Sequence, residues 1–378
     1  MLSIHHDHIG SLLRPTFLVQ AREDVADGRI TQADFKASED RAVDELIALQ
    51  IQAGMQVITD GEARRLSFQA QLPEAVEGFG VWDVNVFLWG EWHGGEDVGD
   101  FEMARPPELG VVSKLRRKRH LCAEEFVYLR ACFAQVLPPD APAPVGKITL
   151  PSPSLWANFW SAEYSGAVYP TLDHFLSDVV DILRDEVQEL ARLGCTYLQL
   201  DAPHYPLLLD PKTRAFYEKQ GWPLTKWLSY GIELDNAVID SAPGVTFGFH
   251  LCRGNQGSRW LVAGGYDLIA QPIFRGIHAE RLLLEYDDGR SGNFEPLRNI
   301  PDDKMVVLGL VTTKSGRRES QPELVRRIHE ASQFVPLERL ALSPQCGFAT
   351  SVMGNHLSWD DERYKLRLVV DTANAVWG

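Results

Sequence analysis

Short apolar runs alternate with longer amphipathic stretches along most of the chain. The apolar runs, which we predict to be buried strands, are residues 4–10, 57–59, 146–150, 196–200, 245–250, 282–285, 306–310 and 339–342. The amphipathic stretches, which we predict to be helices, include residues 34–53, 174–193, 227–240, 322–334 and 360–377. This alternation is typical of repeated βα units built on a parallel sheet.

Eight predicted strands with helices between them indicate an α/β fold, a (βα)8 TIM barrel. The chain has 378 residues, of which 45% are hydrophobic, so it can bury one large core. We therefore predict a single barrel domain over residues 1–378. In such a barrel the active site lies where the strands end, and the polar residues discussed below occupy those positions.

One segment, at about residues 72–107, breaks this alternation. It holds Trp82, Trp89 and Trp92 among many glycines and acidic residues. We predict an inserted aromatic-rich hairpin or lid over the mouth of the barrel. Aromatic packing in the interface of a homo-oligomer explains the same composition equally well.

Charge and cysteine content narrow the functional classes. The net charge of −15 disfavours nucleic acids and anionic membranes as partners, and the basic run 114–120 is expected to be a solvated loop or helix start. The sequence has no N-terminal leader pattern and no apolar stretch long enough to span a bilayer, which predicts a cytoplasmic protein. Five cysteines without close pairing indicate reduced thiols, some of which can be metal ligands.

Three predicted strands end in residues that bind zinc in proteins. His250 and Cys252 are two apart at one strand end, so both side chains point to the same side. Glu285 closes the next strand, and Cys346 follows the last one. One nitrogen, two sulfurs and a carboxylate oxygen form a tetrahedral zinc set, and their wide separation favours a catalytic site over a structural one. Taken alone, Glu285 is better explained as a strand-end carboxylate that pairs with Arg290 or caps a helix, and the three other ligands reverse that balance.

Two further carboxylates, Glu62 and Asp201, follow predicted strands and should face the barrel mouth. Two acids beside a metal site suit the ammonium group of a substrate. Helix capping, or salt bridges with Arg14, Arg64 or Arg65, are the alternatives that the sequence leaves open.

Together these residues resemble the catalytic barrel of cobalamin-independent methionine synthase and its single-barrel relatives. The resemblance spans nearly the whole chain and rests on Ile9-Gly10-Ser11, Asp60-Gly61-Glu62-Ala63-Arg64-Arg65, Leu198-Gln199-Leu200-Asp201-Ala202-Pro203, His250-Leu251-Cys252-Arg253-Gly254-Asn255, Leu284-Glu285 and Pro344-Gln345-Cys346-Gly347. It implies zinc held by His250, Cys252, Glu285 and Cys346. It also implies that Ser11, Glu62 and Asp201 hold the amino acid part of a homocysteine-like thiol, which takes a methyl group from 5-methyltetrahydrofolate.

The chain departs from that family at two points. It has no room for the second, N-terminal barrel that helps the large synthases hold a polyglutamylated folate. Lys314 stands where those enzymes have a histidine linked to proton transfer. We predict that Lys314 acts in catalysis, either as a contact for a substrate anion or as an acid with a lowered pKa; a solvated lysine is the alternative.

The sequence thus predicts a zinc-dependent methyltransferase of methionine biosynthesis. Its expected partners are a small thiol such as homocysteine and a methyl or alkyl donor, brought by folate or by a corrinoid protein. Three alternatives stay open. The first is an epoxyalkane:coenzyme M-type thiol alkyltransferase, in which Lys314 or Arg14 would contact the sulfonate of the substrate. The second is a metal-free decarboxylase of the uroporphyrinogen type. The third is a non-catalytic zinc-binding barrel.

Overall fold

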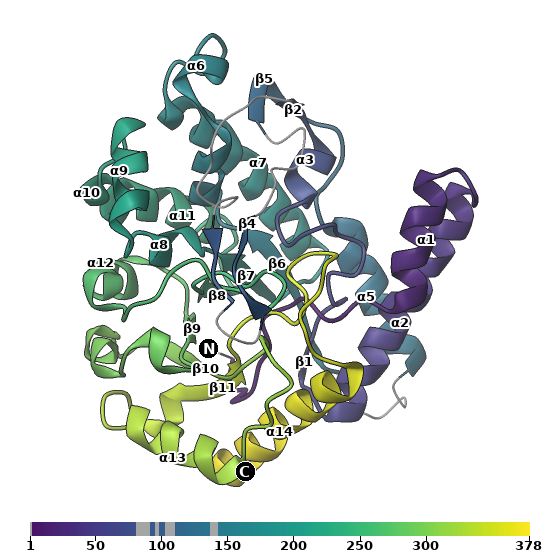
Figure 1. Ribbon diagram of the computed structural model, residues 1–378, viewed down its shortest axis with the longest axis vertical. Helices are drawn as coiled ribbons and strands as arrows, with labels where there is room; N and C mark the ends of the chain where they lie inside the picture. Colours follow the sequence, from purple (N-terminus) through teal and green to yellow (C-terminus); the bar gives the residue numbers. More distant parts are fainter. Residues whose placement is uncertain (1, 81–90, 95–97, 103–109, 137–142) are drawn as a thin grey trace.

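The computed structural model describes residues 2–80, 91–94, 98–102, 110–136 and 143–378. Its central feature is a parallel sheet in the order β1-β6-β7-β8-β9-β10-β11, with helices packed around it (Figure 1). The strands of this sheet are β1 (Val57–Ile58), β6 (Val145–Pro151), β7 (Tyr197–Asp201), β8 (Thr246–Leu251), β9 (Arg281–Glu285), β10 (Met305–Val311) and β11 (Leu340–Pro344). Seven of the eight predicted strands are therefore confirmed, and the curled sheet confirms the α/β barrel class.

Residues 4–10 do not form the predicted strand, although they lie where that strand was expected. His6 forms a single parallel bridge with Leu342 of β11. Beyond it, the hydroxyl of Thr59 donates to the carbonyl of Gly10 at 2.8 Å, next to the end of β1. This segment therefore connects the two edges of the sheet, although the polar sequence His5-His6-Asp7-His8 forms too few ladder bonds to be a strand.

Most described helices follow a strand, as βα units require. They are α1 (Thr16–Ala26), α2 (Gln32–Ala53), α3 (Gln71–Ala75), α5 (Ala123–Val136), α6 (Ala162–Ser165), α7 (Leu172–Arg192), α8 (His204–Leu207), α9 (Pro211–Lys219), α10 (Leu224–Lys226), α11 (Ile232–Ile239), α12 (Asp267–Gly276), α13 (Gln321–Ala331) and α14 (Trp359–Trp377). Shorter turns are η2 (Pro153–Phe159), η3 (Trp227–Gly231), η4 (Gly289–Ser291), η5 (Glu295–Asn299) and η6 (Leu337–Arg339). The predicted helix 227–240 begins with the π-helical turn η3 and becomes α-helical only in α11.

Local sequence explains where the long helices begin and which side they bury. Thr31 and Ser358 form capping boxes at the starts of α2 and α14, which satisfy backbone N–H groups that the helix leaves free. In α7 the buried residues recur at helical spacing, so one side packs on the sheet. The core between helices and strands is apolar, and Leu200, which pairs with Leu150 and Phe249, lies in its central layer.

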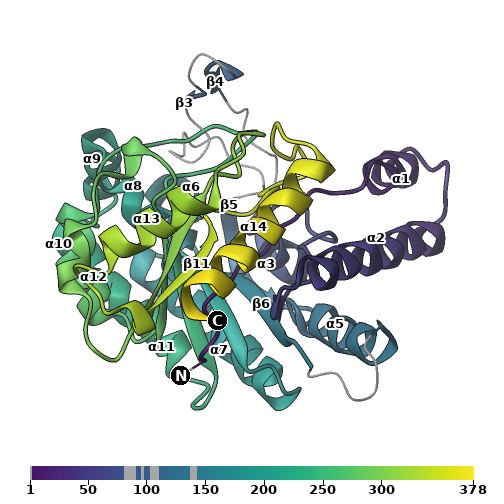
Figure 2. The same ribbon diagram turned by 90° about the horizontal axis from the view of Figure 1, so that it is seen from below.

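The segment from β2 to β5 contains two small antiparallel pairs, and its last strand lies beyond residue 107, where the predicted insertion ends. The strand β2 (Val76–Gly80) pairs with β5 (Gly110–Arg117), and β3 (Glu91–Trp92) pairs with β4 (Phe101–Glu102). Figure 2 shows β3 and β4 standing clear of the main sheet at one end of the molecule. Trp82 and Trp89 lie outside the described residues. The basic run 114–120 was wrongly predicted as a loop or helix start, because its first residues belong to β5.

The two ends of the described chain meet at the outside of the barrel. The ring of His5 stacks on Trp377 with centroids 5.0 Å apart, at the C-terminal end of α14. Among the described helices, none is both long and apolar enough to cross a membrane.

Candidate metal centre and substrate cavity

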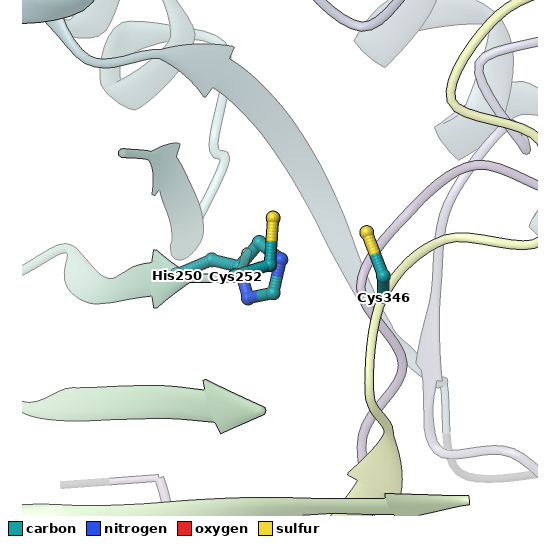
Figure 3. Close-up of side chains that lie close together, drawn as sticks. All are labelled: His250, Cys252 and Cys346. Carbon is teal, nitrogen blue, oxygen red and sulfur yellow. The ribbon is translucent and has the colours of Figure 1, made fainter. Parts of the chain in front are cut away.

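Three side chains from two strand ends converge in the barrel. His250 lies in β8, Cys252 directly follows that strand, and Cys346 follows β11. Their ligand atoms all lie within 4.8 Å of one another, and all three residues are buried. In Figure 3 both sulfur atoms point to the same side, and the imidazole ring of His250 lies beside Cys252. The structure therefore brings together three of the four predicted zinc ligands.

The chemistry of this cluster fits a metal that prefers nitrogen and sulfur. The Nδ1 atom of His250 lies 3.3 Å from the carbonyl of Leu283, and its buried Nε2 atom has no partner among the described residues. Metal-binding histidines commonly use one ring nitrogen for the ion and the other for such a contact. A hydrogen bond with Cys346 and the neighbouring His250 lower the pKa of Cys252 despite its burial, which favours the thiolate.

Glu285, the fourth predicted ligand, lies at the end of β9 but does not join this group within the same distance. Its Oε2 atom accepts the backbone N–H of Arg253 at 2.6 Å. Its Oε1 atom accepts from Nζ of Lys314 at 3.1 Å, and a guanidinium nitrogen of Arg290 lies 3.5 Å away. Both carboxylate oxygens therefore already have partners in the protein.

The predicted lowering of the Lys314 pKa is wrong. Burial alone would lower that pKa, but the carboxylates of Asp287 and Glu285 outweigh burial and raise it. The ammonium group is buried and faces these two acids, at 3.9 Å from Asp287. The sequence could not show this arrangement, because Glu285 and Asp287 lie at the end of β9 whereas Lys314 follows β10.

A cavity of about 760 Å³ opens beside the cluster. Its wall contains His250, Cys252 and Cys346 together with the three predicted substrate-binding residues, which are Ser11, Glu62 and Asp201. The outer part is mostly apolar, with Phe79 and Val352 among its lining side chains. The predicted metal ligands and amino acid contacts, Glu285 excepted, therefore share one cavity, although they are far apart in sequence.

Glu62 is held in an uncommon backbone conformation. Its φ angle is 54°, a region that few residues other than glycine adopt. The hydroxyl of Thr149 donates to its Oε1 atom at 2.7 Å, while the buried Oε2 atom has no partner among the described residues. Gly10 makes room for this carboxylate, because a Cβ atom there would lie 2.6 Å from Oε1. One oxygen of Glu62 thus remains available to a ligand.

Asp201 is the last residue of β7, and its carboxylate is buried. The side-chain amide of Gln199 donates to its Oδ1 atom at 2.8 Å. Burial raises the pKa of Asp201 to about 7, although the neighbouring His250 opposes that shift. A bound cation would stabilise the ionised form of this buried carboxylate, because it would compensate for the hydration lost on burial.

Ser11 packs directly against the turn that carries Cys346. A Cβ atom on Gly347 would lie 1.9 Å from the hydroxyl oxygen of Ser11, so only glycine fits at this position. The side chain of Asn255 also binds this turn, since it donates to the carbonyl of Gly347 at 3.1 Å. Ser11, a predicted substrate-binding residue, therefore packs against the turn that carries Cys346.

Sequence reasoning missed the residues that orient the site. These are Thr149 at Glu62, Gln199 at Asp201, the backbone N–H of Arg253 at Glu285, and Asn255 at Gly347. A signal existed for Gln199, because residues two apart on a strand share a side and it precedes Asp201 by two. The others come from elements distant in sequence and carry no comparable pattern.

The fold and the site together define a class of protein. This is a TIM-barrel-like protein with a buried His–Cys–Cys cluster, and with carboxylates in the same cavity at the strand ends.

Comparison with known proteins identifies the family. Residues 170–375 match the cobalamin-independent synthase catalytic domain. The chain is 34% identical to the uncharacterized protein YxjH of Bacillus subtilis (98% of this chain, 94% of the relative) and 24% identical to a methionine synthase of Pyrococcus abyssi (90% and 84%). The chain belongs to the cobalamin-independent methionine synthase family, a family of methyltransferases.

A solved structure supports the fold independently. The B12-independent methionine synthase from Shewanella sp. W3-18-1, solved in complex with selenomethionine, superposes with a TM-score of 0.74. The match covers 99% of this chain and 98% of that one at 18% identity, so it shows a shared fold.

Proposed function

We propose that the protein transfers a methyl group to the thiol of homocysteine or a closely related amino acid, in a reaction that depends on zinc. The observation that carries this proposal is the shared cavity. It joins a buried His250–Cys252–Cys346 cluster to two carboxylates suited to an ammonium group. Selenomethionine, the ligand of the Shewanella relative, is the selenium analogue of the expected product.

His250, Cys252 and Cys346 would hold the ion through the free Nε2 atom and two sulfurs. Bound zinc would lower the pKa of a substrate thiol and keep the thiolate nucleophilic. We assign Glu62 and Asp201 to the substrate ammonium group and Ser11 to the same amino acid part, so that the thiol is directed toward the cluster.

The structure disfavours the epoxyalkane:coenzyme M-type alternative. A sulfonate needs a free cation, but Lys314 donates to Glu285. Arg14 donates to the backbone carbonyls of Ala349, at 2.8 Å, and Glu62, at 3.0 Å. The two residues that would have met a sulfonate are thus engaged, while carboxylates line the cavity. An amino acid thiol fits these charges better.

The direct test is product formation by zinc-loaded protein. L-homocysteine is supplied with 5-methyltetrahydrofolate or with methylcobalamin, each carrying a deuterated methyl group, and methionine is measured by mass spectrometry. We expect labelled methionine from at least one donor, and none from a Cys346→Ser variant. Absence of labelled methionine with both donors would contradict the proposal.

A further inference from the structure

Glu62, one of the two carboxylates assigned to the substrate ammonium group, is held by a network of buried polar side chains. The hydroxyl of Thr149, in β6, donates to its Oε1 atom at 2.7 Å. Nη1 of Arg65 lies 2.8 Å from the same hydroxyl oxygen. Nη2 of Arg65 in turn donates to Oε2 of Glu125, in α5, at 2.7 Å. Side chains from a helix, a strand and the turn after β1 therefore form one connected network that ends at the cavity.

The chemistry of these groups determines the direction of each hydrogen bond. A guanidinium group has only donors, so the oxygen of Thr149 must accept from Arg65. The single hydroxyl hydrogen of Thr149 is then left for Oε1 of Glu62, which must accept it. The other oxygen, Oε2, is buried without a partner among the described residues. The network thus fixes which oxygen of Glu62 is left for a ligand.

Arg65 does not cancel the charge of Glu62. Its Nη2 and Nε atoms lie 2.7 and 3.2 Å from Oε2 of Glu125, so the cation is paired with that carboxylate. Its Nη1 atom is 3.7 Å from Oε1 of Glu62, and the hydroxyl of Thr149 bridges the two. Two carboxylates and one guanidinium leave one negative charge at the cavity wall. The ammonium group of a ligand would balance that charge.

The backbone of Glu62 is fixed together with its side chain. Its carbonyl accepts the backbone N–H of Arg65 at 3.2 Å and Nη2 of Arg14 at 3.0 Å. These contacts hold the residue at its φ of 54°, a conformation that persists only where the surrounding structure determines it. The carboxylate is therefore held at one place in the cavity wall before any ligand binds, which reduces the cost of ordering it on binding.

We propose that Arg65 and Thr149 are positioning residues, which hold the Glu62 carboxylate so that Oε2 receives the ammonium group of the substrate. This inference rests on the proposed function and adds a specificity to it, because the methyl acceptor must then be a thiol that carries an amino group. The deaminated analogue of homocysteine, 4-mercaptobutanoate, would leave Oε2 unpaired in a buried site. The network therefore selects the amino acid thiol against this analogue.

The test compares L-homocysteine and 4-mercaptobutanoate as methyl acceptors of the zinc-loaded full-length protein. We expect the wild type to prefer L-homocysteine by about 100-fold or more in kcat/KM. Thr149→Val keeps the shape of the side chain but removes the hydroxyl. We expect the KM for L-homocysteine to rise about tenfold in this variant, with kcat within about threefold, and the preference to fall about tenfold. Thr149→Ser keeps the hydroxyl and should retain the preference.

Thr213→Val is the matched control. Thr213 is also buried, and its hydroxyl donates to the carboxylate of Asp210 at 3.0 Å, but it does not contribute to the cavity wall or to the network. This variant should keep the wild-type preference. A general loss of stability caused by removing a buried hydroxyl would affect both threonine variants alike.

A double variant, Arg65→Met with Glu125→Gln, removes the cation and the charge paired with it, and should lower the preference as Thr149→Val does. An unchanged preference in Thr149→Val protein with wild-type zinc content would overturn the inference, and the double variant decides if Thr149→Val does not fold. Wild-type protein that methylates both thiols equally well would also overturn it. Wild-type protein that methylates neither thiol would instead refute the proposed function.

Discussion

At the scale of single residues, the site depends on groups that burial has deprived of water. His250 presents a buried nitrogen and Glu62 a buried oxygen without partners among the described residues. A buried polar atom without a partner destabilises the folded protein unless a ligand binds to it. These two atoms therefore indicate a binding site. The sequence predicted these residues because each stands at a strand end. It could not predict that Lys314 pairs with Glu285, since side-chain pairing across strand ends has no sequence pattern.

The first prediction at this scale concerns the thiol of Cys346. Cys346→Ser removes one soft ligand, so we expect loss of most bound zinc with an unchanged circular dichroism spectrum. Metal content by mass spectrometry is the measurement. Cys132→Ser is the matched control, because Cys132 is also buried but lies outside the cluster. Equal zinc content in the Cys346→Ser variant and the wild type would remove this residue from the metal site.

The second prediction concerns the charge of Asp201. Asp201→Asn keeps the shape but removes the charge that we assign to the substrate ammonium group. We expect the KM for L-homocysteine to rise roughly 10- to 100-fold while zinc content stays the same. Glu74→Gln is the control, since Glu74 lines the outer cavity and lies 3.8 Å from Arg119. An unchanged KM in the Asp201→Asn variant would contradict the assignment.

At the scale of elements, the strand ends and the turns after them determine the geometry. The long strands and helices were predicted because their apolar periodicity is strong, as in α7. The N-terminal segment was mispredicted because its polar residues form only a single bridge to β11, and β5 because its pairing with β2 joins residues that are distant in sequence. Gly347 shows why fine geometry also escaped prediction, since its need for glycine depends on the position of Ser11.

One element carries a pH-dependent contribution to stability. Glu362, in the first turn of α14, accepts the backbone N–H of Leu13 at 2.9 Å, and burial raises its pKa to about 8. The folded state therefore holds this proton more tightly than the unfolded state. The stabilisation that results from this tighter proton binding is complete at a pH below the pKa of Glu362 in the unfolded chain. It is lost as the pH rises through about 8, so the free energy of unfolding should fall by about 2 kcal/mol between pH 6 and 8.

Glu362→Gln should remove that fall, because an amide does not titrate in this range. Urea denaturation at pH 6, 7 and 8 with saturating zinc measures the difference from the wild type. Asp360→Asn is the control, because this exposed acid lies in the same helical turn. A wild type and a Glu362→Gln variant with the same pH dependence would show that Glu362 is ionised in the folded protein.

At the scale of the whole molecule, the barrel unites residues that are hundreds of positions apart. Ser11 and Cys346 approach each other because the N-terminal segment lies between β11 and β1, which closes the sheet. The sequence predicted the barrel class and the convergence of His250, Cys252 and Cys346 at the strand ends. The sequence could not predict the 760 Å³ cavity or the separation of Glu285 from the cluster, because both depend on how the strand ends are arranged in space.

The central claim is that this cluster holds zinc and receives a substrate thiol. Zinc content and X-ray absorption at the zinc edge, recorded before and after addition of L-homocysteine, test it most directly. We predict two sulfur ligands and one histidine nitrogen in the resting protein, and one additional sulfur in place of a lighter ligand after homocysteine is added. Protein without zinc, or zinc whose sulfur count does not change with homocysteine, would contradict the account.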